Sequence, residues 1–193
     1  MSSKGDAARA KILQSAQALF SQKGFCAVTM QDICQATGFS RGGLYRHYGS
    51  TEEIFIDLVR EEQSAAHEEL ERAKAINIGP ERILRHFLQS RMHKLCQEEH
   101  SFDVAVSEFA ANSEKGHQVL ADRASESIAV LMELIEWGNW EGAFHCDCPE
   151  CTAKHIVWLT EVMSRHNSLL PISEEEIQQQ ITLVRQLLGC DSH

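Results

Sequence analysis

Apolar residues recur at steps of three and four along nearly all of this 193-residue chain, the spacing that places side chains on one face of an α-helix. Only 3 Pro and 11 Gly interrupt the pattern, which favours helices further. We find no convincing strand, and we therefore predict an all-α protein with about nine helices. The expected helices cover approximately 6–23, 29–36, 41–47, 51–75, 80–95, 102–111, 115–138, 149–163 and 173–188.

The first fifty residues contain short helices separated by turn signals. Thr29 and Asp32 have the spacing of a capping box, Gly38 interrupts the pattern, and Ser40 is placed to cap the helix that follows. Two short helices joined by a glycine-containing turn, the second of them polar and basic, indicate a helix-turn-helix that reads DNA. In this interpretation the Leu44 side chain packs the second helix against the first, which supports it.

The side chains of this second helix suit contact with DNA. Arg41 can donate two hydrogen bonds to a guanine edge or one to a phosphate. Gly42 and Gly43 each cost a helix about 1 kcal/mol relative to Ala, which fits a helix that must approach the major groove closely. Tyr45 and His47 supply donors that suit phosphate oxygens.

Thr29 and Ser40 are candidates for the same interface, since their hydroxyl groups can bond phosphates. The alternative is that both residues serve only as helix caps. Tyr45 has a similar alternative, as a partly buried aromatic residue.

A set of spaced residues in this region resembles the DNA-binding signature of TetR-type transcriptional repressors, over about Ala8 to Leu58. The resemblance implies a three-helix DNA-binding head at 1–50, followed at 51–193 by a larger helical body for effector binding and dimerisation. It implies DNA contacts by Thr29, Arg41, Gly42, Gly43, Tyr45 and His47. Thr51 stands where such proteins often have a phosphate-binding Lys, so its hydroxyl could bond a phosphate without adding charge. The matching residues are Gly24, Phe25, Thr29, Ile33, Gly38, Ser40, Gly42, Leu44, Tyr45, His47 and Tyr48.

The same resemblance implies a ligand-released repressor that binds a palindromic double-stranded operator as a homodimer. Segments near 80–140 would enclose an effector pocket, with Phe87, Arg91 and Leu95 as lining candidates, and Arg91 could meet an anionic group. The last two helices would pair with a second subunit, although ordinary packing within the chain is the alternative for some of these residues. The apolar residues assigned to that interface are Ile156, Leu159, Met163, Ile177, Ile181, Val184 and Leu188.

Three thiols and an imidazole lie close together in the sequence, at Cys146, Cys148, Cys151 and His155. Such groups are ligands for Zn²⁺ or another soft metal ion, and Cys151 and His155 would lie one above the other on a helix. The spacing differs from the paired CxxC arrangement of structural zinc sites. A metal-responsive regulator, a redox sensor and an incidental group of thiols in an ordinary turn are therefore all open.

The net charge of −10 at first argues against a nucleic-acid partner. Residues 1–51 nevertheless hold six Lys or Arg and two Asp, a local balance of +4, so the acidic excess belongs to the body. No nucleophile–base set, phosphate-binding loop or HExxH pair favours an enzyme, and a thiol-dependent metal-handling protein or enzyme is only a remote alternative. No apolar run approaches the ~20 residues of a membrane span, and there is no apolar signal core, so we expect a cytoplasmic protein without a membrane partner.

Overall fold

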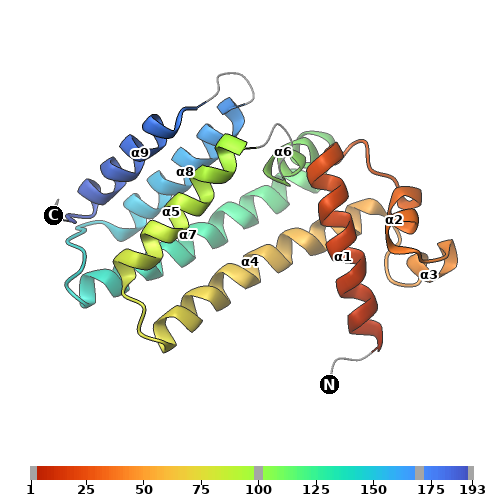
Figure 1. Cartoon of the computed structure of the whole chain (residues 1–193), viewed down its shortest axis with the longest axis horizontal. Coiled ribbons are helices and arrows are strands. Elements are labelled where there is room, and N and C mark those ends of the chain that lie inside the picture. The colour runs from red at the N-terminus through yellow and green to blue at the C-terminus, as the bar shows by residue number, and fades with distance from the viewer. Residues whose placement is uncertain (1–3, 98–101, 168–171, 191–193) are drawn as a thin grey trace. The chain divides into compact units, whose positions relative to one another are not determined.

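The computed structural model describes residues 4–97, 102–167 and 172–190, and within these ranges all regular secondary structure is helical. The all-α prediction is confirmed (Figure 1). No helix in the described ranges is long and apolar enough to cross a membrane. The helices are α1 (Lys4–Lys23), α2 (Met30–Thr37), α3 (Arg41–Tyr45), α4 (Thr51–Ala75), α5 (Pro80–Gln97), α6 (Phe102–Asn112), α7 (Gly116–Trp140), α8 (Pro149–Asn167) and α9 (Glu174–Leu187).

Local capping chemistry sets the start of several helices, as the sequence predicts. At α2, the backbone N–H of Asp32 donates to Thr29 Oγ1 at 3.2 Å, and the Asp32 carboxylate accepts from the Thr29 N–H at 2.9 Å. Ser173 and Glu176 form the same reciprocal pair at α9. These bonds satisfy backbone donors that a helix start leaves without intrahelical partners.

The described residues divide into two compact units. The first comprises Met1–Glu62 and His100–Arg123, and the second comprises Gln63–Glu99 and Ala124–His193. The first unit, which we call the head, thus extends beyond the expected boundary at residue 50. It takes in the first half of α4, all of α6 and the start of α7. We call the second unit the body.

The core of the head contains, among its aliphatic residues, a cluster of aromatic rings from α1, the turn after it, α4 and α6. The Phe20 and Phe55 rings meet edge to face with centroids 4.9 Å apart, and Phe109 lies 5.0 Å from Phe55. Phe25 and Phe102 extend this cluster. Because α6 supplies two of the five rings and packs on α1, the head depends on a segment far along the chain.

The core of the body is built from aliphatic residues of α5, α7, α8 and α9. Leu88, Ile135, Ile156 and Leu188 are fully buried. Helix α5 packs on both α8 and α9, and the three run alongside one another in Figure 1. This arrangement buries one face of α8 and one face of α9 inside the chain itself.

The seven residues predicted for a subunit interface lie on these inward faces. Leu159 is partly buried against the core of the body, and the other six are buried in it. Within the described residues they therefore pack inside the body, as in the alternative of ordinary packing within the chain, and their part in a subunit interface stays a prediction. The strongest apolar stripe of an amphipathic helix faces the core of its own chain, because that burial removes the most apolar surface from water.

Candidate nucleic-acid interface

Helix α3 is held in place by one buried side chain and one cap. Leu44 is fully buried in the core of the head. At the start of α3, Ser40 Oγ accepts a hydrogen bond from the Gly43 N–H at 3.1 Å. Leu44 is the only buried residue of α3; the predicted contact Gly43 is half-buried beside Ser40, and the other three residues are exposed.

The outward surface of α3 carries the predicted DNA-reading groups. Arg41, Gly42 and His47 are exposed, and 45% of the Tyr45 surface is exposed. A Cβ atom built on Gly42 would meet no other atom of the chain within 4 Å. Packing within the protein therefore does not require a glycine at position 42. The absence of a side chain instead leaves room for another molecule to approach the backbone.

Three other residues predicted to contact DNA, Thr29, Ser40 and Thr51, lie at the N-terminal ends of helices. The Thr29 hydroxyl donates to the Asp32 carboxylate while accepting from the backbone, so its bonding capacity is largely used in the cap. Ser40 uses its oxygen as the cap of α3. Thr51 is half-buried as the first residue of α4. Thr29 and Ser40 therefore have structural roles whether or not they also contact DNA.

The charge of Asp32 strengthens this arrangement. Hydrogen bonds from the Thr29 side chain and from Lys23 hold the pKa of Asp32 well below its usual range. The Lys23 ammonium lies 2.9 Å from Asp32 Oδ1 and ties the end of α1 to the start of α2. This ion pair supports the orientation of α1 relative to α2 on the exposed side of the two helices.

A polar network joins α1, the turn after α3 and α4. The Tyr48 hydroxyl donates to Asp57 Oδ2, and Arg9 Nε donates to the same oxygen at 3.0 Å. Burial and the bond to Asp57 raise the pKa of Tyr48. Burial alone would raise the pKa of Asp57, but the bonds from Arg9 and Tyr48 outweigh it and lower that pKa. Beside this network, Arg9, His47, Tyr48 and Asp57 line a hollow of about 140 Å³, room for a few water molecules.

Sequence reasoning did not identify Arg46 as a candidate DNA contact. This exposed side chain belongs to the residue that caps the C-terminal end of α3, beside the predicted contacts Tyr45 and His47. The signal that could have found it was its positive charge within the basic segment 41–47. The Arg9–Asp57–Tyr48 network was also missed, because its members are far apart in the sequence.

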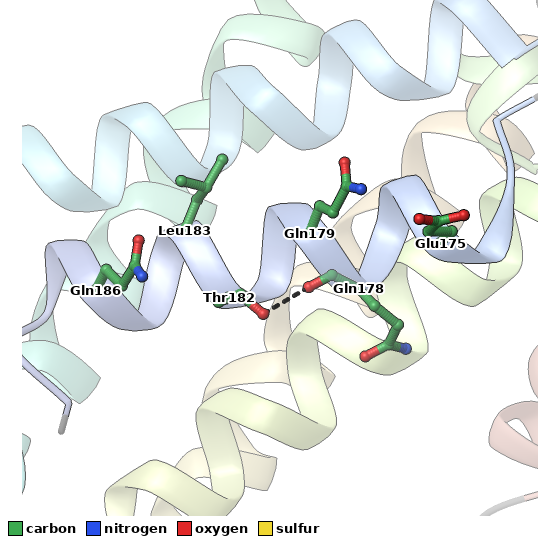
Figure 2. A pocket seen from close by; sticks show the side chains of 6 residues that line it. All are labelled: Glu175, Gln178, Gln179, Thr182, Leu183 and Gln186. Carbon is green, nitrogen blue, oxygen red and sulfur yellow. Dashed lines mark hydrogen bonds between the residues drawn. The ribbon is translucent and has the colours of Figure 1, made fainter. Parts of the chain in front are cut away.

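The predicted effector residues belong to α5 of the body, and neither Phe87 nor Arg91 lines the hollow in the head or the hollow along α9. Phe87 packs partly buried against the core, and Arg91 forms an ion pair with Glu161 at 3.4 Å. Leu95 lies in α5, but its side chain is outside the described residues. A second hollow, of about 530 Å³, runs along α9 and is lined by polar residues and Leu183, not by Phe87 or Arg91 (Figure 2).

The predicted metal-ligand residues are divided between different environments. Cys148 and Cys151 form a disulfide, with their Cα atoms 5.4 Å apart. Cys146 is buried, with its Sγ 3.2 Å from Thr152 Oγ1, while His155 is exposed. Within the described parts of the chain, no three His, Cys, Asp or Glu side chains are grouped to hold a metal ion. A disulfide sulfur is no longer a thiolate ligand, so this geometry gives the metal alternative no support.

Comparison with protein families finds one that matches the head. The family of bacterial regulatory proteins described as tetR matches residues 12–58, from the middle of α1 into α4. This segment includes every residue predicted to contact DNA.

Two curated relatives match the same region. The HTH-type transcriptional regulator YfiR of Bacillus subtilis is 44% identical over 54 residues, which are 28% of this chain and 26% of that protein. The HTH-type transcriptional repressor AcnR of Corynebacterium efficiens is 37% identical over 54 residues, 28% of this chain and 29% of that protein. The chain thus matches little more than a quarter of the length of each relative.

The similarity of fold extends through the body. The crystal structure of the reduced form of Escherichia coli NemR has a TM-score of 0.79 and covers 96% of this chain and 100% of that one, at 17% sequence identity. The helical body therefore has the same fold as a solved structure, although the sequences have diverged widely.

Proposed function

We propose that this chain, which belongs to the TetR family of helix-turn-helix transcriptional regulators, controls transcription by binding double-stranded operator DNA through α3. The observation that carries the proposal is the outward face of α3, where Arg41, Tyr45 and His47 surround the open backbone of Gly42. The family is one of regulatory proteins and not of enzymes. DNA binding would place the protein with the chromosome, in the bacterial cytoplasm.

The exposed groups on α3 fit the chemistry of a major groove. Arg41 is the side chain that can discriminate a base, through two hydrogen bonds to guanine O6 and N7. Tyr45, Arg46 and His47 can donate to phosphate oxygens and fix the position of α3 along the duplex. Gly42 permits the backbone to approach the groove without a side chain in between.

The chain acts as a homodimer in this proposal, with α8 and α9 of two copies packed together. Each helix has a second, outward apolar face: Trp158 and Val162 on α8 are 61% and 54% exposed, and Leu183 and Leu187 on α9 are 50% and 52% exposed. Each pair is four residues apart, so its members share one side of their helix. Leu183 also lines the hollow along α9 shown in Figure 2. Burial of this face against a second copy would remove exposed aromatic and aliphatic surface from water.

Repression and ligand release complete the proposal. AcnR is described as a repressor, and repression is the mode we propose for this chain. A small-molecule effector bound by the body would lower operator affinity if it prefers the DNA-free state, with a coupling free energy typically of ~1–3 kcal/mol. Two symmetry-related heads would read a palindromic operator with half-sites separated by about one helical turn or a multiple of it.

The test is selection of DNA from a random double-stranded pool by the full-length protein, followed by sequencing of the bound fraction. We expect an inverted repeat to be enriched. The matched control is the Arg41→Ala/Tyr45→Ala double variant, which should enrich no motif while retaining the helical circular dichroism of the original chain. Enrichment of the same repeat by both proteins, or of no sequence by either, would overturn the proposal.

A further inference from the structure

The start of α8 carries a disulfide between Cys148 and Cys151, whose Cα atoms lie 5.4 Å apart. Both residues are exposed to solvent. Cys148 immediately precedes the helix, and Pro149 and Glu150 separate it from Cys151 in the first turn. The two sulfurs are therefore accessible to small reactants on the surface of the body.

The segment that leads into this turn is anchored to two other helices. The His145 N–H donates to the carbonyl of Leu188 at the end of α9, at 2.8 Å. The Asn139 side chain bonds both the N–H and the carbonyl of Cys146, at 3.0 and 2.9 Å. Reduction of the disulfide breaks none of these contacts, and the Thr152 N–H, which donates to the Cys148 carbonyl at 3.0 Å, holds Cys148 against the first turn of α8.

A disulfide at this position adds little to the stability of the fold. Its partners are three residues apart and lie in a turn that the helix already orders, so the bond closes a very short loop. A disulfide that stabilises a fold usually joins segments that are distant in the sequence. An accessible bond between neighbouring cysteines is instead suited to repeated opening and closing.

The N-terminal end of α8 also favours the reactive form of a thiol. Helix starts carry partial positive charge and N–H groups without intrahelical partners, and both stabilise a thiolate. Two acidic residues flank the pair: Glu150 forms an ion pair with Lys154 at 2.5 Å, which offsets its negative charge, and the exposed Asp147 precedes Cys148. A thiolate is the species that attacks a disulfide.

We propose that Cys148 and Cys151 form a reversible dithiol–disulfide pair that exchanges with low-molecular-weight thiols and disulfides. In the oxidising direction, one cysteine thiolate attacks a sulfur of a small disulfide, forms a mixed disulfide and releases one small thiolate. The second cysteine then attacks the protein sulfur of the mixed disulfide and releases the other small thiolate. Two electrons pass from the protein sulfurs to the small disulfide, and the two protons lost by the cysteines are taken up by the released thiolates.

Other thiols of the same chain serve as internal controls. Cys26 is exposed on the head with its sulfur in the reduced state, so it can form a mixed disulfide but has no cysteine beside it in the sequence to resolve it. Cys146 is buried with its Sγ beside Thr152 Oγ1 and should react slowly. The proposed pair rests on sulfur chemistry alone and does not depend on DNA binding.

The experiment equilibrates the full-length protein with defined mixtures of reduced and oxidised glutathione, quenches with acid, alkylates free thiols and analyses the peptides by mass spectrometry. We expect Cys148 and Cys151 to lose their alkyl labels together, with the loss of two hydrogens and no glutathione adduct, while Cys26 gains an adduct. The oxidised fraction should follow the ratio of oxidised glutathione to the square of reduced glutathione. In Cys148→Ser and Cys151→Ser, the remaining cysteine should accumulate the adduct that the original chain resolves.

Two results would overturn the proposal. One is independent glutathione adducts on Cys148 and Cys151 in the original chain, as on Cys26. The other is that both residues keep their alkyl labels in mixtures that fully modify Cys26. Both results are read on the unmutated protein, so they do not depend on the folding of a variant.

Discussion

The carboxylate of Glu108 lies against Gly24, where a Cβ atom on Gly24 would come within 2.5 Å of Glu108 Oε2. The same oxygen accepts a hydrogen bond from the Cys26 N–H at 3.3 Å. Glu108 belongs to α6, and Gly24 ends α1 with φ of +77°. This contact fixes α6 on the turn that leads from α1 to α2.

Substitution of Gly24 tests how much this close approach matters. In Gly24→Ala, the positive φ costs roughly 1–2 kcal/mol, and the Glu108 side chain must also move. Gly38→Ala is the matched control, because Gly38 has φ of +73° in the same unit and a Cβ atom added there would meet nothing within 4 Å. We expect Gly24→Ala to lower the free energy of unfolding by at least ~1 kcal/mol more than Gly38→Ala, measured by urea denaturation. Equal losses would show that the contact with Glu108 contributes nothing.

Gly42→Ala separates stability from DNA binding. A methyl group there meets nothing in the chain, and Ala is a better helix residue by about 1 kcal/mol. We expect thermal denaturation to show unchanged or slightly raised stability. Affinity for selected operator DNA, measured by fluorescence anisotropy, should fall roughly tenfold, equivalent to ~1.4 kcal/mol, because the methyl group holds α3 away from the groove. An unchanged affinity would mean that the DNA does not approach Gly42.

The Asp57 network predicts a pH-dependent contribution to the stability of the head. The pKa of Asp57 is lower in the folded protein than its ordinary value, so its ionised form stabilises the fold. That contribution is complete above the unfolded pKa of ~3.9 and is lost as the pH falls toward the folded pKa. We expect Asp57→Asn to lower the free energy of unfolding by about 1 kcal/mol at pH 7, since both Asp57 and Arg9 are partly exposed.

The measurement is a series of urea denaturation curves for both proteins between pH 7 and pH 3. The difference between them should narrow at the acid end of the series. A difference that stays constant across the range would show that the charge of Asp57 does not carry the effect.

The outward apolar face of α8 and α9 predicts the assembly state. Leu183→Glu/Leu187→Glu places two charges on this face, and we expect this variant to be monomeric in analytical ultracentrifugation, where the original chain should be the proposed dimer. Ile76→Glu is the control, because Ile76 is 69% exposed but lies after the end of α4, away from these two helices in the sequence. A dimer that persists in the double variant, or an original chain that is monomeric, would contradict the proposed interface.

The sequence predicted features that depend on neighbouring residues, and it failed where partners are distant. The Thr29–Asp32 cap and the Ser40 cap were readable because each involves one turn of chain. The packing of Phe109 into the head was not readable, because α6 is separated from α1 by four intervening helices, and periodicity does not identify the partner of an apolar face. The fold class and the position of helix α3 were thus predictable from local signals alone.

Local sequence signals also did not show which side of α9 is buried in the chain, or which of the thiols pair. Periodicity identified Ile181 and Val184 as an apolar face, but only the structure shows that α5 covers that side and that Leu183 lies outward. The thiol spacing was compatible with either metal binding or oxidation, and the structure pairs Cys148 with Cys151. Which sulfurs meet depends on the exact turn at the start of α8.

The most direct test of the proposal that α3 contacts DNA is to measure the affinity of Arg41→Ala for the selected operator DNA. The matched control is Arg82→Ala, which removes an exposed Arg from α5 in the body. Anisotropy titrations at several salt concentrations should show binding by Arg41→Ala weakened by about 1–3 kcal/mol, with Arg82→Ala equal to the original chain. Equal affinity of Arg41→Ala and Arg82→Ala for the operator would contradict the assignment of α3 as the reading helix.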